Sequence, residues 1–252
     1  MHKIFAKPLF LGKKVVFLPQ CHSTNDELAV LAKNSKEPEG LALYTHDQTK
    51  GKGQRGNAWI AEPGKNMLIS VLLRPGFLDP QNQFYLNLIT GLAIIDVLKE
   101  FIPNDLTLKW PNDVYIEDRK IAGILIESNM RGSTLESSIV GVGLNVNQKG
   151  FALPKATSMS IETGDDFDLN DIMENFLLKL EKWYLKLKAG AKGDILDQYH
   201  QLLMWRGEKR KFRNADEEFF GEIVGIDQHG RLAINYDGSL HYYGIKEVEF
   251  VG

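Results

Sequence analysis

A stretch rich in glycine and lysine, residues 45–59, constrains the fold of this chain more than any other feature. It reads THDQTKGKGQRGNAW, and Gly51, Gly53 and Gly56 alternate in it with cationic and polar side chains. Glycine takes backbone conformations that other residues avoid, and it lets N–H groups turn toward a ligand. The stretch therefore predicts a loop that holds a phosphate or a carboxylate, with a flexible, solvated basic loop as the alternative.

The spacing of these glycines matches the dinucleotide-binding fingerprint, which requires a strand before the glycines and a helix directly after them. Residues 41–45 favour the strand, but the apolar run 67–73 predicts a second strand where the fingerprint needs a helix. A Walker A loop does not fit either, because Asn57 and Ala58 follow Gly56 in place of lysine and serine or threonine. The loop is therefore neither of the two common nucleotide loops.

The composition narrows the choice of partners and compartment. The 252 residues include 43% hydrophobic and 25% charged side chains, which is typical of one globular domain with a small appendage. A net charge of −3 gives no general attraction to DNA or to a membrane, so we expect neither as a partner. Cys21 is the only cysteine, which excludes an internal disulfide, and no signal peptide is recognisable; both features predict a cytoplasmic protein.

Hydrophobic periodicity predicts an α+β chain. Helices are expected at 83–101, 168–187 and 195–205, and a further helix is expected to begin with a capping box formed by Thr24 and Glu27. Strands are expected at 15–19, 41–45, 67–73, 106–110, 114–116, 120–127 and 135–147. Four short β segments joined by hairpin turns follow at 209–213, 218–227, 231–236 and 240–244. We therefore predict one domain over 1–206 and a small barrel-like domain over 207–252.

Two neighbouring segments combine residues with useful chemistry. Residues 109–113, KWPND, bring a cation, an indole, an amide and a carboxylate to the end of a predicted strand. The hairpin that follows returns Lys120 toward these residues. Each segment alone is explained as a turn or as a solvated edge lysine, but their coincidence favours a shared site.

Polar residues at two other places are suited to small ligands. Ser23, Thr24 and Asn25 stand at a predicted helix N-terminus, which offers free N–H groups unless it is simply a well-formed helix start. Asn145 and Asn147 follow a glycine-rich strand end that allows close approach of a base or a ribose. The six histidines never occur at ligand spacing, so we expect no protein-held metal, and Mg²⁺ would arrive on nucleotide phosphates.

Taken in order and spacing, these segments resemble the biotin protein ligases. The resemblance rests on residues 23–25, Gln48 with 51–56, 109–113, 119–123, 141–145 and the C-terminal β segments. It implies a mixed β-sheet flanked by helices, similar to the class II synthetases, with an SH3-like β-barrel at the C-terminus. It also implies that biotin and ATP give biotinyl-5′-AMP and pyrophosphate. A lysine of a biotin carboxyl carrier protein, in acetyl-CoA carboxylase or another biotin-dependent enzyme, then takes the biotinyl group.

The resemblance assigns site residues by position. The residues expected to bind biotin are Ser23, Thr24, Asn25, Gln48, Lys52, Gly53, Gln54, Lys120 and Gly123. The residues expected to bind ATP are Gly51, Arg55, Gly56, Trp59, Lys109, Asn112, Lys120 and Asn145, with Trp59 stacked on the adenine. Lys120, Lys52 and Asp113 are expected to act in catalysis.

The chemistry of the implied reaction agrees with this assignment. Attack of a carboxylate on an α-phosphate brings two anions together, so the site needs fixed positive charge. Lys120 is suited to that role, and Lys52 with Arg55 can neutralise the developing charge. Our hypothesis for Asp113 is that it helps to desolvate or deprotonate the acceptor amine.

The chain departs from the family pattern in two respects. The family's loop usually carries arginines where Lys52 and Gln54 stand, and the uncharged Gln54 predicts weaker retention of the adenylate. The catalytic domain is also expected to begin almost at Met1, as in short members without the N-terminal helix-turn-helix, so we expect no DNA regulation. A homodimer through a sheet edge is a further implication of the resemblance.

The residues also allow two other functions. A lipoate or octanoate ligase or transferase has the same fold and the same class of reaction. A non-catalytic protein that binds nucleotides or nucleic acid through the basic loop and the small barrel is the alternative from a different class.

Overall fold

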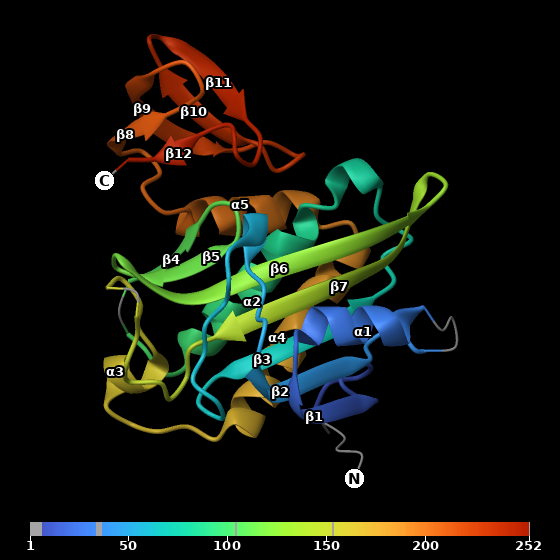
Figure 1. Ribbon diagram of the computed structural model, residues 1–252. Coiled ribbons are helices and arrows are strands. Elements are labelled where there is room, and N and C mark those ends of the chain that lie inside the picture. Colours follow the sequence, from blue (N-terminus) through green and yellow to red (C-terminus); the bar gives the residue numbers. More distant parts are fainter. Residues whose placement is uncertain (1–6, 34–36, 104, 153, 252) are drawn as a thin grey trace.

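The computed structural model describes residues 7–33, 37–103, 105–152 and 154–251, and it contains a mixed seven-stranded sheet (Figure 1). The strands lie in the order β1-β2-β3-β7-β6-β5-β4. Their bounds are β1 Val15–Cys21, β2 Ala42–Gln48, β3 Met67–Leu73, β4 Leu106–Lys109, β5 Asp113–Ile116, β6 Arg119–Arg131 and β7 Thr134–Leu144. Strands β1 and β2 are parallel and the other neighbours are antiparallel, so the predicted mixed sheet is confirmed.

Helices cover both faces of this sheet. Helix α1 (Thr24–Ala32) packs on β2, β3 and β7, in front of the sheet in Figure 1. Helices α2 (Tyr85–Leu98), α4 (Leu169–Lys188) and α5 (Lys192–Leu202) pack on the opposite face. The short elements α3 (Met159–Thr163), η1 (Gln54–Gly56) and η2 (Pro80–Asn82) lie in the connections.

Strand β3 is buried on both faces of the sheet. All seven of its residues are buried, as expected for a strand with packed layers on both faces. Met67, Ile69 and Val71 belong to the large core under α2 and α4, whereas Leu72 belongs to the small core under α1. Ser70 alternates with them, so its side chain points to the α1 face.

A second sheet follows the first, with five antiparallel strands in the order β11-β10-β9-β8-β12. Its strands are β8 Lys209–Arg213, β9 Glu218–Ile226, β10 Leu232–Tyr236, β11 Ser239–Tyr243 and β12 Glu249–Phe250. It lies above α5 in Figure 1 and agrees with the predicted SH3-like domain.

Hydrogen bonds join the second sheet and its turns to the part of the chain that precedes it. The indole Nε1 of Trp110, whose side chain is 2% exposed, donates to the carbonyl of Gly230 at 2.9 Å. His200 on α5 joins them as well, because its Nε2 lies 2.9 Å from the backbone N of Ile226 in β9. Burial lowers the pKa of His200, so the neutral imidazole that accepts from this N–H is favoured.

The structure corrects the predicted start of the first helix. Ser23 is the N-cap residue and its side chain makes no cap hydrogen bond, so the capping box of Thr24 and Glu27 is wrong. Thr24 instead uses its backbone N–H and its hydroxyl to bond Gln48. The predicted helix 195–205 is shifted to Lys192–Leu202, and the short α3 and β12 were not expected.

Candidate functional site

One pocket, with a cavity volume of about 130 Å³, lies on the α1 face of the first sheet. Its walls are the start of α1, the loop 50–59 and the adjoining parts of β5, β6 and β7. Helix α1 contacts β7 but is not among the main neighbours of β6, which leaves this part of the sheet face to the loop. The site is therefore built from four segments that are distant in the sequence.

Three glycines form the floor of the pocket. Gly143 of β7 pairs with Gly123 of β6, and Gly141 lies two residues earlier on the same face. The indole of Trp59 lies directly on the first two: a Cβ added at Gly123 would be 2.9 Å from Trp59 Cζ3, and one at Gly143 would overlap the indole. Glycine is required here because the strands must let a large ring approach their backbone.

The indole nitrogen of Trp59 has no hydrogen-bond partner among the described residues, although the atom is buried. A buried donor without an acceptor costs about 1–3 kcal/mol. Trp59 is half-buried as a residue, and Lys120 Nζ lies 5.5 Å from its ring centroid. The ring and its free N–H thus line a polar pocket next to a cation.

The loop 50–59, called the flap from here on, is a short hairpin. Trp59 N–H donates to the carbonyl of Gly51, Lys52 pairs with Ala58, and η1 forms the tip. Gly56 has a φ of +83°, which fits the turn at this tip. No α-helix follows the glycines, so the rejection of a dinucleotide fingerprint is confirmed.

An ion pair ties the flap to the helix start. Lys52 Nζ lies 2.5 Å from Asp26 Oδ1 in the first turn of α1. The hydrogen bond to Asp26 raises the pKa of Lys52, so the flap lysine stays charged at neutral pH. Both side chains are close to half exposed, so the pair contributes little to stability and can open easily.

Hydrogen bonds fix the polar wall at the start of α1. Gln48 Oε1 accepts from the backbone N–H of Thr24 at 2.8 Å and from its hydroxyl at 3.1 Å. Ser70 Oγ lies 2.7 Å from both Thr24 Oγ1 and Asn25 Oδ1. Asn25 Nδ2 donates to Glu127 Oε2 at 2.7 Å, so the orientation of this amide is set from two sides.

Ser70 and Glu127 were missed by the sequence analysis. Ser70 is the one polar residue in the buried strand Met67–Leu73, and an uncompensated buried hydroxyl is a signal that could have identified it. Glu127 gives no comparable signal, because it is an exposed polar residue of β6 after the apolar stretch 121–126. Gly141 is explained by the same wall, since a Cβ there would overlap the amide of Asn25.

The charged centre of the pocket is an ion pair between Lys120 and Asp113, with 2.7 Å between Nζ and Oδ1. The two side chains are 29% and 22% exposed, so water screens the pair only in part. Asp113 opens β5 and pairs with Gly123, which brings its carboxylate to the edge of the glycine floor. Asn112 beside it donates its amide to the carbonyl of Ile124 at 2.7 Å.

The segment after β7 runs beside Lys120. The backbone N–H of Lys120 donates to Lys155, and its carbonyl accepts from Thr157. The Asn145 side chain donates to the Thr157 carbonyl at 2.9 Å, and its own exposure is 4%. Asn145 therefore supports the segment 155–157 and does not line the pocket.

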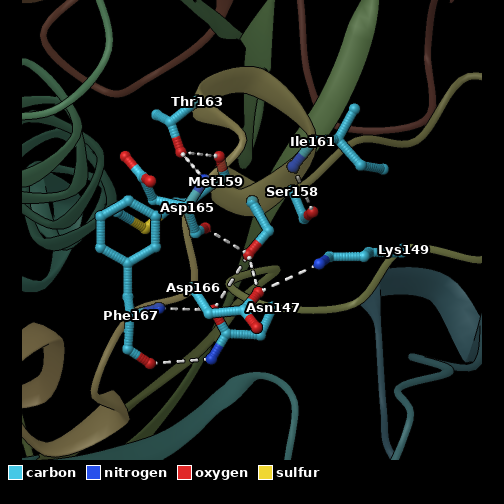
Figure 2. Close-up of polar contacts among 10 residues, drawn as sticks. Asn147, Lys149, Ser158, Met159, Ile161, Thr163, Asp165, Asp166 and Phe167 are labelled. Atoms are coloured by element: carbon cyan, nitrogen blue, oxygen red, sulfur yellow. Dashed lines mark hydrogen bonds and ion pairs between the residues drawn. The ribbon is translucent and has the colours of Figure 1, made fainter.

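Asn147 anchors a later part of the chain, residues 165–167, as Figure 2 shows. Its Nδ2 donates to the carbonyl of Phe167 at 2.8 Å, and its Oδ1 accepts from the N–H of Phe167 at 2.9 Å. Ser160 Oγ lies within 2.9 Å of Asp166 Oδ1 and 2.7 Å of the Asp165 carbonyl. Asn147 therefore anchors a loop, whereas the sequence suggested that it could read a base or a ribose.

Most residues predicted for the site lie in this one pocket. Those that line it are Ser23, Thr24, Asn25, Gln48, Lys52, Gly53, Gln54, Trp59, Asn112, Asp113, Lys120 and Gly123. Gly51, Gly56, Lys109 and Asn145 are described but lie outside its lining. The side chain of Arg55 lies outside the described part of the chain, so its predicted role stays a prediction.

Lys109 lies next to the pocket in an aromatic environment. Its Nζ is 5.1 Å from the ring centroid of Tyr115, 5.4 Å from that of Trp205 and 5.2 Å from that of Phe250. Burial lowers the pKa of this lysine, although Asp113 acts in the opposite direction. Its predicted contact with ATP stays a prediction.

Within the described residues, no three histidine, cysteine or acidic side chains are grouped so that they could hold a metal ion. Asp113 is the one carboxylate in the lining of the pocket, and Lys120 already pairs with it. The lining thus offers Mg²⁺ no group of carboxylates. A separate finding concerns membranes: over the same described part of the chain, no helix has the length and apolarity needed to cross one.

Comparisons with known proteins point to one family. The model of the biotin/lipoate A/B protein ligase family matches residues 17–145. Biotin–protein ligase 2 of Arabidopsis thaliana is 35% identical over 92% of this chain and 72% of its own length. The biotin–[acetyl-CoA-carboxylase] ligase of Mycobacterium tuberculosis is 30% identical over 87% of this chain and 82% of its own. The biotin protein ligase of Aquifex aeolicus, solved in complex with biotin and ATP, has a TM-score of 0.80 at 27% identity and covers 95% of this chain and 100% of its own.

Proposed function

The chain belongs to the biotin/lipoate A/B protein ligase family, and from this premise we propose that it is an ATP-dependent biotin protein ligase. In the first step the biotin carboxylate attacks the α-phosphorus of ATP, a C–O–P link forms and pyrophosphate leaves. In the second step the amine of an acceptor lysine attacks the activated carbonyl, an amide forms and AMP leaves. The relatives compared here are biotin ligases, so the lipoate alternative is not favoured.

The observation that carries this proposal is the single pocket that gathers the helix start, the flap, residues 112–113 and Lys120. The two anionic groups of the first step repel each other, so a cation must stand between them. Lys120 is a half-buried ammonium held in that pocket by Asp113. We assign to it the contact with the biotin carboxylate and the α-phosphate.

The polar wall is our candidate for the biotin head group. Ser23, Thr24, Asn25 and Gln48 present hydroxyl and amide groups to the pocket, which suits the donors and acceptors of a cyclic urea. Gln48 accepts both hydrogen bonds from Thr24 through its Oε1. In this proposal its Nε2 donates to the ligand. Trp59 and the three floor glycines supply the apolar surface.

The flap and the segment 155–157 are our candidates for the nucleotide side. In this proposal Lys52, Gly53 and Gln54 close over the adenylate, and Lys52 exchanges Asp26 for the phosphate. Closure over a mixed anhydride keeps water from hydrolysing it. Gly51, Arg55, Gly56, Asn112 and Asn145 are further members of the ATP set that the sequence predicts by position. Mg²⁺ is proposed to enter on the ATP phosphates.

Partners and domain limits are proposals of the same kind. The name of the mycobacterial relative supports a biotin carboxyl carrier protein of acetyl-CoA carboxylase as the acceptor. We further propose that residues 1–206 form the catalytic domain and 207–252 the SH3-like domain, because β8 begins at Lys209. A homodimer, the absence of DNA binding and a cytoplasmic location stay predictions.

Biotin-dependent exchange of labelled pyrophosphate into ATP tests the proposal. We expect exchange with biotin, followed by transfer of biotin to an isolated acceptor domain. Exchange with lipoate but not with biotin would establish the lipoate alternative. No exchange with either acid, in protein that is folded by circular dichroism, would favour a non-catalytic binding protein.

A further inference from the structure

A lateral row of residues crosses the sheet from the pocket floor to Lys109. Gly143 pairs with Gly123, Gly123 with Asp113, and Asp113 with Lys109. Residues directly opposite each other in antiparallel strands project to the same face, with Cβ atoms about 5 Å apart. Lys109 therefore stands beside Asp113, on the side away from the glycine floor.

The row gives Asp113 two cationic neighbours with different surroundings. Lys120 faces the pocket, where it can be drawn to a ligand. Lys109 is enclosed by the rings of Tyr115, Trp205 and Phe250, and cation–π contacts of this kind hold an ammonium in place. Phe250 comes from β12, so the second sheet supplies part of the enclosure.

The proposed reaction makes the second cation necessary. When Lys120 turns to the biotin carboxylate and the α-phosphate, Asp113 loses its ion-pair partner at a site where its side chain is 22% exposed. An unpaired carboxylate at such a site tends to take up a proton or to move. Either change would remove the carboxylate that our hypothesis places next to the acceptor amine in the second step.

We propose that Lys109 is a positioning residue that keeps Asp113 ionised and in place while Lys120 engages the substrates, and that the second sheet holds Lys109 in that position. This inference rests on the proposed function for its role in catalysis. Its structural part, the coupling of Lys109 to Asp113, does not depend on any substrate.

Four titratable groups act on Asp113 from the surrounding elements. They are Lys109 of β4, Tyr115 of β5, Lys120 of β6 and Tyr199 of α5. Burial raises the pKa of Tyr115 to about 12 and also raises the pKa of Tyr199, so both phenols are neutral at physiological pH. The two lysines are therefore the charged groups among these four.

Titration of Asp113 in the ligand-free, full-length protein tests the coupling. Carboxyl ¹³C-labelled aspartate reports the pKa by NMR, and the Asp113→Asn variant identifies the resonance. Lys109→Met should raise the pKa of Asp113 by about one unit, because a neighbouring positive charge is lost. Lys109→Arg should restore it, and Lys209→Met, an equal charge change on an exposed lysine of β8, should leave it unchanged. An unmoved pKa in Lys109→Met would overturn the proposal.

Phe250→Leu tests the part played by the second sheet and serves as a second probe should Lys109→Met not fold. It removes one ring of the enclosure and keeps an apolar side chain, so the pKa of Asp113 should move upward by a smaller amount. A lower melting temperature with no change at Asp113 would mean that the sheet only stabilises the fold.

Kinetics separate this role from ATP binding. Lys109→Met should lower kcat for acyl transfer and shift the acid limb of its pH profile upward, while KM for ATP stays constant. A raised KM for ATP with an unmoved Asp113 pKa would make Lys109 an ATP ligand and overturn our inference. If the wild-type protein shows no ligase activity, only the proposed function is contradicted. The titration of Asp113 uses no substrate, so it still tests the coupling to Lys109.

Discussion

Lys120 Nζ and Asp113 Oδ1 lie 2.7 Å apart, so the cation proposed to bind the substrate anions is already paired with a carboxylate. A ligand must therefore compete with Asp113 for this ammonium. A phosphate oxygen that takes the place of the carboxylate gives this ammonium another close anionic partner. The free-energy cost of exchanging partners at Lys120 is consequently small. The exchange couples binding of the two substrate anions to release of Asp113.

Removal of Lys120 should abolish the first step. In Lys120→Ala, biotin-dependent exchange of pyrophosphate should fall by about a thousandfold or more, as when a preorganised transition-state donor is lost. The melting temperature should change little, because the side chain is partly exposed. Lys99→Ala, on an exposed residue after α2, is the control and should exchange normally. Normal exchange in Lys120→Ala would remove its assigned role.

Asp113→Asn should separate the two steps. The amide keeps the shape of the side chain but cannot accept a proton, so adenylate formation should continue while transfer to the acceptor slows by about a hundredfold. Single-turnover transfer from preformed biotinyl-AMP measures the second step directly. Wild-type rates in both steps would exclude Asp113 as the base.

Gly143→Ala should disturb the pocket floor. A methyl group there overlaps the Trp59 indole, so the ring must move away from β7. We expect KM for biotin to rise about tenfold or more, with a change in tryptophan fluorescence. Gly150→Ala is the matched control, since a Cβ at that position meets nothing within 4 Å. Equal KM values in the two variants would show that the contact of Trp59 with the floor is unimportant for biotin.

Gln54→Arg should hold the adenylate longer. Gln54 lines the pocket at the tip of the flap, and an arginine there adds a charged hydrogen-bond donor for the phosphate. A charged hydrogen bond contributes about 1.5–3 kcal/mol, which corresponds to slower release by tenfold or more. Release of labelled biotinyl-AMP measures it, with Gln81→Arg, on an exposed residue of η2, as the control. Unchanged release would mean that position 54 does not reach the phosphate.

His200 should make the junction of the two sheets sensitive to acid. Its pKa is lowered by burial from an ordinary value of 6.5, so above pH 6.5 the imidazole is neutral in both the folded and the unfolded chain. Below that pH the unfolded chain takes up the proton first, and the free energy of unfolding therefore falls. We expect part of the loss in melting temperature between pH 7 and 5 to disappear in His200→Leu. An identical loss in both proteins would contradict this.

The sequence predicted the fold well where a pattern repeats. The strand Met67–Leu73 and the helix Leu169–Lys188 have long runs with one clear period, and both occur as expected apart from their ends. The start of the first helix was misjudged because Thr24 has a tertiary partner, Gln48, that no local pattern reveals. The same holds for Asn145 and Asn147, whose amides bond to backbone groups of a later segment.

The KWPND segment shows why sequence reasoning locates a site more easily than it assigns roles within it. Asn112 and Asp113 line the pocket, as predicted. Trp110 is buried and bonds to the turn at Gly230, and Lys109 lies among aromatic rings. Residues of one short motif therefore have partners in two different parts of the structure. Only the three-dimensional partners distinguish these uses.

The hydrogen bond from Trp110 to Gly230 has a practical consequence for protein engineering. Residues 207–252 look like a removable module, yet their loss would leave a buried indole N–H without an acceptor, at a cost of about 1–3 kcal/mol. It would also remove Phe250, one of the three rings around Lys109 on the strand that adjoins Asp113. A shortened enzyme for biotin labelling should therefore carry a redesigned surface around Lys109 and Trp110. A simple truncation at residue 206 should lose activity along with stability.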